Sequence, residues 1–225
     1  MKATPVIAGV FAGVIVFGSA LLAAYRPAPP TAKVTGGLNL ALEPRHPVTL
    51  KMAQDAKAVI GEPAPEIDLP DTDGKQVKLS ELVNQTPVVV ITLKDGCPCT
   101  IESQPFFNDL AEKYKGKVQF LGVTDGTKYK ASKYKDDFSV PFPIVTEPGT
   151  HTFEAFQSPR SVYFTLVKKG GAVRKLWPGY SKKTLDEFNQ ALAQESGIPT
   201  PKLDTTMAPD KESSGCKFGE PVAAP

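Results

Sequence analysis

Apolar and polar positions divide the chain into four stretches. Residues 1–26 contain an uncharged run of nineteen residues, 6–24, whereas prolines and glycines interrupt residues 27–60. Residues 61–196 show strand-like and helical apolar spacing, and residues 197–225 keep no sustained period. We therefore expect a membrane anchor or signal sequence, a proline-rich linker, one folded domain and a disordered tail, in that order.

The apolar run near the N-terminus predicts a transmembrane helix. Nineteen residues at about 1.5 Å each roughly span the ~30 Å core of a bilayer. A signal peptide usually has a shorter apolar core, so the pattern favours an uncleaved anchor over a cleaved signal. Either kind of segment would export the folded domain. We expect a membrane-anchored domain in an extracytoplasmic compartment, periplasmic or extracellular.

The folded stretch begins with a hairpin pattern. Apolar and polar residues alternate at 67–69 and 77–79, and Gly74 between them supplies the positive φ of a tight turn. The β-branched run at 87–93 is typical of a strand buried on both faces. Further spacing predicts a helix at 97–116, strands at 118–123, 142–145, 161–167 and 172–177, and helices at 128–138, 151–156 and after Ser181, which can cap the last helix. This order predicts an α/β fold with a central mixed sheet flanked by helices.

Composition excludes several classes of function. The net charge is only +2 and no long run of Lys or Arg is present, so we expect no nucleic-acid partner. The sequence has no Ser/His/Asp set, no phosphate-binding glycine loop and no zinc-spaced cluster, and we expect no cofactor. Three cysteines are few for a disulfide-stapled fold, and two of them are nearly adjacent. That pair therefore indicates a chemical role for the two thiols rather than a disulfide that stabilises the fold.

The nearly adjacent pair lies in Cys97-Pro98-Cys99, between the predicted buried strand and the following helix. Free N–H groups and the positive end of the helix dipole favour thiolate there, and can lower a cysteine pKa from ~8.5 to roughly 3.5–7.5. Gly96 and Pro98 mark a turn rather than packed core. The pattern predicts a dithiol redox centre, and Lys94 is expected to assist the thiolate.

The one-residue spacing of the pair constrains a disulfide. Residues i and i+2 of a regular helix have Cα atoms about 5.4 Å apart, but their Cβ atoms point to nearly opposite sides. A Cys97–Cys99 bond therefore needs a non-helical turn or is strained, and a strained bond is readily reduced. We assign Cys97 as nucleophile and Cys99 as the resolving thiol. The reverse assignment, and a role for Cys216 in the tail, stay open.

Several motifs in this order resemble the redoxin branch of the thioredoxin superfamily, which includes the alkyl hydroperoxide reductase/thiol-specific antioxidant (AhpC/TSA) family and the TlpA-like thioredoxins. They are Gly61-Glu62-Pro63-Ala64-Pro65 before the hairpin, the cysteine turn, and the stretch at 158–164 followed by Lys169-Gly170-Gly171. The resemblance covers roughly residues 61–194. It implies a thioredoxin fold with an N-terminal β-hairpin extension.

The resemblance also implies roles for two residues outside the cysteine turn. Pro159 stands where the thioredoxin fold usually places a cis-proline beside the cysteines. Arg160 stands where peroxiredoxins often hold an arginine that lowers the thiol pKa. The cysteines themselves depart from both patterns: TlpA-like proteins usually have Cys-x-x-Cys, and neither cysteine here has the Pro and Thr that peroxiredoxins place seven and three residues earlier.

Three functions fit these residues. The first is thiol–disulfide exchange with exported protein partners and a reducing donor, through Cys97 and Cys99. The second is peroxiredoxin-like reduction of hydroperoxides, to which Arg160 points. The third is copper binding, as in the Sco proteins, because two thiolates and the His151 imidazole suit soft Cu(I). His46, in the expected linker, is a poorer ligand.

Overall fold

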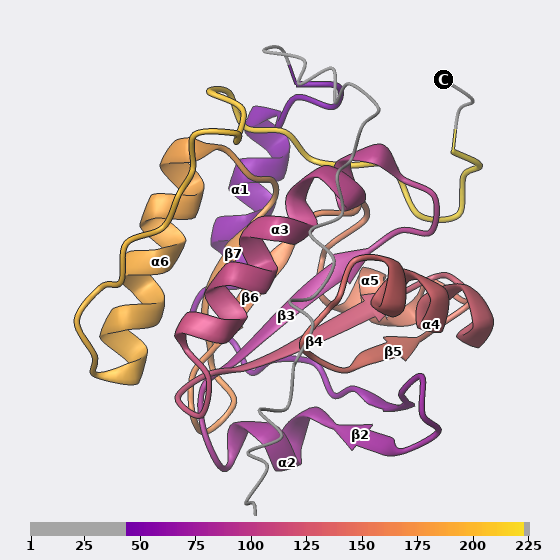
Figure 1. The fold of residues 1–225 in the computed structure, drawn as a ribbon, viewed down its shortest axis with the longest axis horizontal. Helices are drawn as coiled ribbons and strands as arrows, with labels where there is room; N and C mark the ends of the chain where they lie inside the picture. The colour runs from indigo at the N-terminus through magenta and orange to yellow at the C-terminus, as the bar shows by residue number, and fades with distance from the viewer. Residues whose placement is uncertain (1–43, 223–225) are drawn as a thin grey trace, which may run out of the picture. The chain divides into compact units, whose positions relative to one another are not determined.

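The computed structural model describes residues 44–222 (Figure 1). The predicted anchor at 1–26 and the linker up to residue 43 lie outside the described residues, so that prediction stays a prediction. From residue 44 to 222, no helix is long and apolar enough to cross a membrane.

A five-stranded mixed sheet, in the order β5-β4-β3-β6-β7, forms the centre of the described chain. Its middle strand is β3 (Val88–Leu93), all six residues of which are buried, as the β-branched run predicts. Next to β3, β4 (Gln119–Thr124) runs parallel, and β5 (Ile144–Thr146) runs parallel to β4. On the other side, β6 (Phe164–Val167) and β7 (Val173–Trp177) complete the sheet as an antiparallel pair. The predicted mixed sheet is confirmed.

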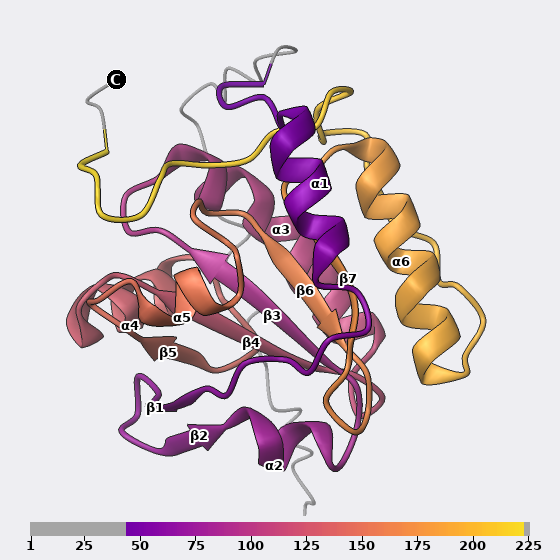
Figure 2. The ribbon, with the colours of Figure 1, turned by 180° about the vertical axis from the view of Figure 1, so that it is seen from behind.

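Helices and a hairpin cover the two faces of this sheet (Figures 1 and 2). The face of Val89 and Ile91 packs against α3 (Pro98–Lys113), α4 (Lys128–Asp137) and α6 (Lys182–Ser196). The opposite face packs against the hairpin of β1 (Asp68–Pro70) and β2 (Gln76–Lys78), together with α2 (Leu79–Val83) and α5 (His151–Ala155). Because β3 is covered on both sides, its carboxyl end meets the start of α3 inside the protein.

Local signals account for most element boundaries. Gly74 has φ +87° in the hairpin turn, as expected. Ser181 caps α6: its Oγ accepts from Thr184 N–H at 3.1 Å, and Gly197 ends the helix with φ +69°. The strand expected to begin at 161 begins at Phe164, because Ser161 and Val162 form a turn, from which Ser161 Oγ contacts Cys97 Sγ.

The described parts of the expected linker and tail, residues 44–60 and 197–222, are ordered. Within the linker stretch, α1 (Leu50–Ala58) is capped by Thr49 and lies beside β7 (Figure 2). The prediction of a disordered tail is wrong for residues 197–222. Ser213 makes isolated bridges to Pro47 and Tyr180, and the Phe218 ring stacks on Phe153 with centroids 3.6 Å apart. These contacts involve single residues, so they leave no periodic pattern in the sequence.

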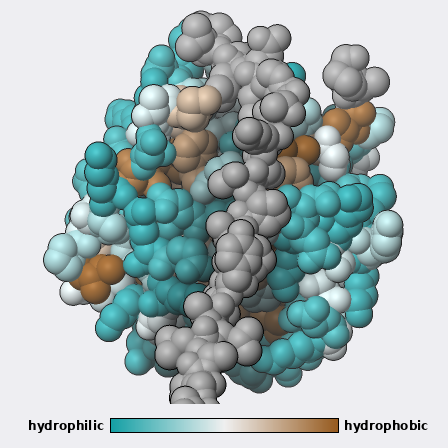
Figure 3. Space-filling view, in the orientation of Figure 1, coloured by the Kyte–Doolittle hydropathy of each residue, from teal (hydrophilic) through white to brown (hydrophobic). Residues whose placement is uncertain are grey.

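The visible face of the domain offers no broad apolar surface. In Figure 3 the side chains are mainly hydrophilic, and the hydrophobic ones form small separate patches. Long apolar side chains that stay exposed in the described chain are few: Leu50, Ile60, Ile101, Tyr129 and Met207. The buried thiols, rather than an exposed apolar surface, are therefore the candidate functional site of this domain.

Candidate active site

The cysteine turn lies where β3 passes into α3. Cys97 is the N-cap of α3, with extended backbone angles φ −74° and ψ 122°, and Pro98 is its first helical residue. Proline suits that position because its missing N–H has no partner within the helix. Cys99 follows inside the first turn. The pair therefore straddles the helix boundary, in the non-helical geometry that a disulfide with this spacing requires, and both thiols are free.

The Cys97 sulfur is buried and surrounded by hydrogen-bond donors. Its Sγ accepts from Ser161 Oγ at 3.3 Å and from the backbone N–H of Cys216 at 3.3 Å. Hydrogen bonding from the Cys99 thiol, with smaller contributions from Ser161 and Cys216, outweighs burial and lowers the pKa of Cys97 to about 3. Cys97 is therefore a thiolate at neutral pH, as a nucleophile must be.

The other two thiols are shifted the opposite way. Hydrogen bonding to Cys97 and then burial raise the pKa of Cys99 far above its ordinary range. Burial first, and then hydrogen bonding to Cys97, raise the pKa of Cys216 to about 12. At neutral pH the cluster therefore holds one thiolate and two protonated thiols that donate to it, which favours Cys97 over Cys99 as nucleophile.

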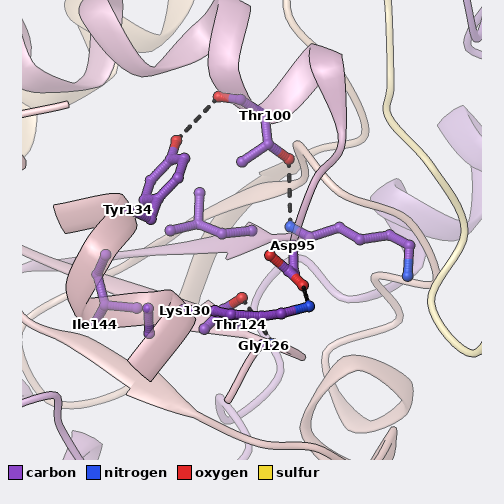
Figure 4. A pocket seen from close by; sticks show the side chains of 10 residues that line it. Asp95, Thr100, Thr124, Gly126, Lys130, Tyr134 and Ile144 are labelled. Carbon is purple, nitrogen blue, oxygen red and sulfur yellow. Dashed lines mark hydrogen bonds and ion pairs between the residues drawn. The ribbon is translucent and has the colours of Figure 1, made fainter. Parts of the chain in front are cut away.

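A second set of contacts, made by Thr100 with Lys94 and Tyr134, holds the cysteine turn in place. Thr100 Oγ1 accepts from Lys94 N–H at 3.3 Å, and the Thr100 carbonyl accepts from Tyr134 Oη at 3.2 Å (Figure 4). These residues line a cavity of about 20 Å³, which is room for about one water molecule. Lys94 Nζ pairs with Asp125 Oδ2 at 2.8 Å. The charge of Lys94 is thus paired with Asp125, and it acts weakly on Cys216, in the direction of a lower pKa.

Pro159 and Arg160 lie close to the cluster but hold the C-terminal segment rather than a thiol. The described residues contain no cis peptide bond, so the expectation of a cis-proline at 159 is wrong. The Pro159 carbonyl accepts from Phe218 N–H at 3.0 Å, and Arg160 Nη1 donates to the Gly215 carbonyl at 3.1 Å. The charge of Arg160 acts weakly on Cys216, in the direction of a lower pKa.

The structure adds residues that sequence reasoning missed or set aside. Ser161, a buried donor to Cys97, carries no sequence signal of its own. His46, set aside as a linker residue, has its Nε2 3.6 Å from Cys216 Sγ. Its carbonyl accepts from Ser214 N–H at 2.8 Å, which ties residues near both ends of the described chain together.

The alternative copper site of Cys97, Cys99 and His151 is not formed in the part of the chain that the structure describes. His151 is exposed at the first position of α5, whereas Cys97 and Cys99 are buried at the start of α3. Among residues 44–222, no three His, Cys, Asp or Glu side chains are grouped so that they could hold a metal ion. Cys97, Cys99 and His151 have suitable chemistry for Cu(I), but the fold does not bring them together into a metal site.

A groove of about 580 Å³ opens beside the thiol cluster. It is lined in part by Arg45, His46, Pro98, Arg160, Cys216 and Lys217. Cys216 is partly exposed in its wall, whereas Cys97 and Cys99 are 0% and 1% exposed and do not line it. The thiol that a molecule in the groove meets is therefore Cys216.

The known proteins that this chain resembles are thiol oxidoreductases. Residues 60–177, more than half of the chain, match the AhpC/TSA family. The chain is 26% identical over 143 residues to a thiol-disulfide oxidoreductase ResA of Bacillus cereus, covering 62% of this chain and 82% of that protein. It is 28% identical over 97 residues to peroxiredoxin Bcp of Escherichia coli, covering 43% of this chain and 62% of that protein.

The fold has solved counterparts as well. The thioredoxin domain of a thiol-disulfide oxidoreductase from Bacteroides vulgatus superposes with a TM-score of 0.52 at 18% identity, over 59% of this chain and 96% of that one. At this identity the likeness concerns the fold alone. Together with the mixed sheet and its flanking helices, it shows that the domain has the thioredoxin fold.

Proposed function

Because the chain belongs to the AhpC/TSA family and is a thiol oxidoreductase, we propose that it exchanges thiols and disulfides with exported protein partners, using Cys97 and Cys99 as its redox couple. One observation carries this proposal: Cys97 is the N-cap of α3, its Sγ accepts hydrogen bonds from Ser161 Oγ and Cys216 N–H, and a second cysteine lies two residues away. Hydrogen bonding from Cys99 and from these two residues lowers the pKa of Cys97. That pairing supplies both a nucleophile and a resolving thiol.

The reaction follows from these protonation states. The Cys97 thiolate attacks one sulfur of a partner disulfide, so that a Cys97–partner bond forms, the partner bond breaks, and the released partner sulfur takes a proton. Cys99 then loses its proton and attacks Cys97 Sγ, which closes the Cys97–Cys99 disulfide and releases the second partner thiol. The partner gains two electrons, and a reducing donor restores the dithiol. The same steps run backwards when the partner is a dithiol.

The stabilised thiolate sets the expected reduction potential. A low pKa at Cys97 favours the reduced form, and it makes Cys97 a good leaving group when its disulfide is attacked. The disulfide is therefore expected to be labile, with a potential above the roughly −300 mV typical of structural disulfides.

The test is a count of free thiols in the full-length protein, equilibrated with glutathione redox buffers. We expect a reversible two-electron transition that Cys216→Ser retains and that Cys97→Ser abolishes. The double variant Cys99→Ser/Cys216→Ser should also lose it, because Cys97 then has no partner thiol. Loss of the transition in Cys216→Ser alone, or a potential below roughly −300 mV, would contradict the proposed couple.

Peroxide reduction is the second candidate, and family membership is the observation that favours it. In that reaction Cys97 attacks one oxygen of the hydroperoxide, the O–O bond breaks, the other oxygen leaves as water or an alcohol, and Cys97 becomes a sulfenic acid. Cys99 or Cys216 then condenses with it to a disulfide with loss of water. Against it, Arg160, the residue expected to lower the thiol pKa in a peroxiredoxin, donates to the Gly215 carbonyl at 3.1 Å and acts weakly on Cys216, in the direction of a lower pKa. A second-order rate constant with hydrogen peroxide far above that of free cysteine would favour this second function.

A further inference from the structure

The three thiols have unequal access to solvent. Cys97 and Cys99 are buried, and the segment at 213–218, called here the C-terminal strap, lies over Cys97. Cys216, within this strap, contacts Cys97 on one side and the 580 Å³ groove on the other. A protein partner in the groove therefore meets Cys216 before it meets Cys97.

Backbone hydrogen bonds hold Cys216 in this place. Its carbonyl accepts from Ser161 N–H at 3.0 Å, and Gly215 N–H donates to the Ser161 carbonyl at 2.6 Å. Next along the strap, Lys217 makes an isolated bridge with Arg160. Because Ser161 also donates to Cys97, one residue positions both sulfurs of the pair.

We propose that Cys216 is a relay thiol: it takes over the disulfide from Cys99 by bonding to Cys97, and it exchanges with the partner protein in the groove. The proposal rests on the proposed function, which supplies the Cys97–Cys99 couple, and it adds the residue through which that couple reaches a partner.

Oxidation of a partner dithiol through the relay takes three steps. First, Cys216 Sγ attacks Cys97 Sγ; the Cys97–Cys216 bond forms, the Cys97–Cys99 bond breaks, and the proton of Cys216 ends on Cys99. Second, a partner thiolate attacks Cys216 Sγ, and Cys97 leaves as a thiolate. Third, the other partner thiol closes the partner disulfide and passes its proton to the departing Cys216. The partner loses two electrons, and the chain ends with its thiols reduced.

Access and leaving-group chemistry favour the same second step. Attack on Cys216 comes from the groove, whereas attack on Cys97 requires the strap to move. The sulfur expelled by attack on Cys216 is Cys97, the thiol with the lowest pKa of the three, and a thiol of low pKa leaves fastest. Attack on Cys97 would instead expel Cys216, whose pKa is raised to about 12.

His46 is placed to move the proton of Cys216. Its Nε2 lies 3.6 Å from Cys216 Sγ, and both side chains line the groove. An imidazole at this place can relay these protons: away from Cys216 toward Cys99 in the first step, and from the partner thiol to Cys216 in the third. General acid–base help of this kind typically contributes about 10²–10⁴-fold to a rate.

The first test traps the relay in the full-length Cys99→Ser variant. Oxidation with diamide, a thiol oxidant, should give a Cys97–Cys216 disulfide on non-reducing peptide mapping by mass spectrometry. A limiting amount of reduced glutathione, followed by acid quenching and alkylation, should then leave glutathione on Cys216 and alkylated Cys97. Glutathione found on Cys97, or failure of the two cysteines to bond, would overturn the relay.

The second test compares rates in proteins that keep Cys97 and Cys99. We expect reduction of the oxidised protein by glutathione to slow roughly tenfold or more in Cys216→Ser, and also in His46→Gln. The matched control, Lys133→Gln, removes an exposed charge on α4 that does not line the groove, and should react at the wild-type rate. An unchanged rate in Cys216→Ser, with its two-electron transition intact, would refute the relay and leave the proposed function standing. Absence of the transition from every variant would refute both.

Discussion

The backbone N–H of Cys216 donates to Cys97 Sγ at 3.3 Å, although the two residues lie 119 positions apart. This bond stabilises the thiolate, and it also places a third thiol against the reactive sulfur. The C-terminal strap is thereby part of the candidate active site. Reactivity at Cys97 should accordingly depend on residues that hold the strap in place.

Ser161→Ala should raise the pKa of Cys97. The Ser161 hydroxyl donates to the sulfur at 3.3 Å, and a hydrogen bond to a charged group contributes about 1.5–3 kcal/mol, or roughly one to two pKa units. Ultraviolet absorbance of the thiolate against pH measures the shift. Ser158→Ala is the control, since that buried hydroxyl donates to the Phe156 carbonyl and should leave the pKa of Cys97 unchanged. Equal titration curves for the two variants would count against the bond.

Gly215→Ala should loosen the strap. A Cβ on Gly215 would lie 2.1 Å from Ser161 Oγ and 3.0 Å from the Ser161 carbonyl oxygen, too close for either to stay in place. A clash of this kind typically costs about 1–3 kcal/mol, so the open population should rise roughly tenfold or more.

The rate at which iodoacetamide alkylates Cys97 in the reduced protein measures this opening. Gly149→Ala is the matched control, because its Cβ would meet only side-chain atoms of Glu147 and His151 at 3.4 and 3.5 Å. If both variants alkylate at the wild-type rate, the strap does not guard Cys97.

The stability of the reduced protein should depend on pH through Cys97. Its folded pKa, about 3, lies below its unfolded value of ~8.5, so between these values the unfolded chain binds more protons. The Cys97 contribution to the free energy of unfolding is therefore complete above the unfolded pKa and is lost as the pH falls toward the folded one.

Urea unfolding with reductant present, compared between wild type and Cys97→Ser, isolates this contribution from that of the carboxylates. We expect the difference in unfolding free energy to grow between about pH 4 and pH 8. Above the ordinary thiol pKa the trend should reverse for wild type, because the raised pKa values of Cys99 and Cys216 keep their protons on the folded protein. A difference that is constant with pH would show that Cys97 is not a thiolate.

Asp125→Ala should destabilise the protein at the turn of Lys94 and Asp95, which directly precedes the cysteines. Asp125 pairs with the buried Lys94 at 2.8 Å and accepts from Asp95 N–H at 2.9 Å. Removing one partner of a buried ion pair typically costs about 3–5 kcal/mol. Asp137→Ala, which breaks an exposed pair with Lys133, is the control and should cost less than about 1 kcal/mol in chemical denaturation. Equal costs would mean that Lys94 is not held as a buried charge.

Local signals in the sequence determined the elements and the centre of the chemistry. The β-branched run predicted β3, the serine at 181 predicted the start of α6, and the cysteine turn between strand and helix predicted a thiolate at a helix N-terminus. Each depends on neighbours within a few residues, since apolar periodicity and helix caps are local properties of the chain. The family resemblance supplied the fold, and the match over residues 60–177 confirmed it.

Only the tertiary structure decided which residues surround the thiolate. Ser161 and Cys216 come from separate parts of the sequence and donate to Cys97, and His46, from a third part, contacts Cys216. Gly215 allows the close approach to Ser161, because a Cβ there would lie 2.1 Å from Ser161 Oγ. Such contacts depend on how two distant parts of the chain fit together, so they leave no periodic pattern in the sequence. For the same reason the sequence pattern predicted a disordered tail, and favoured His151 over His46 as the histidine beside the thiols.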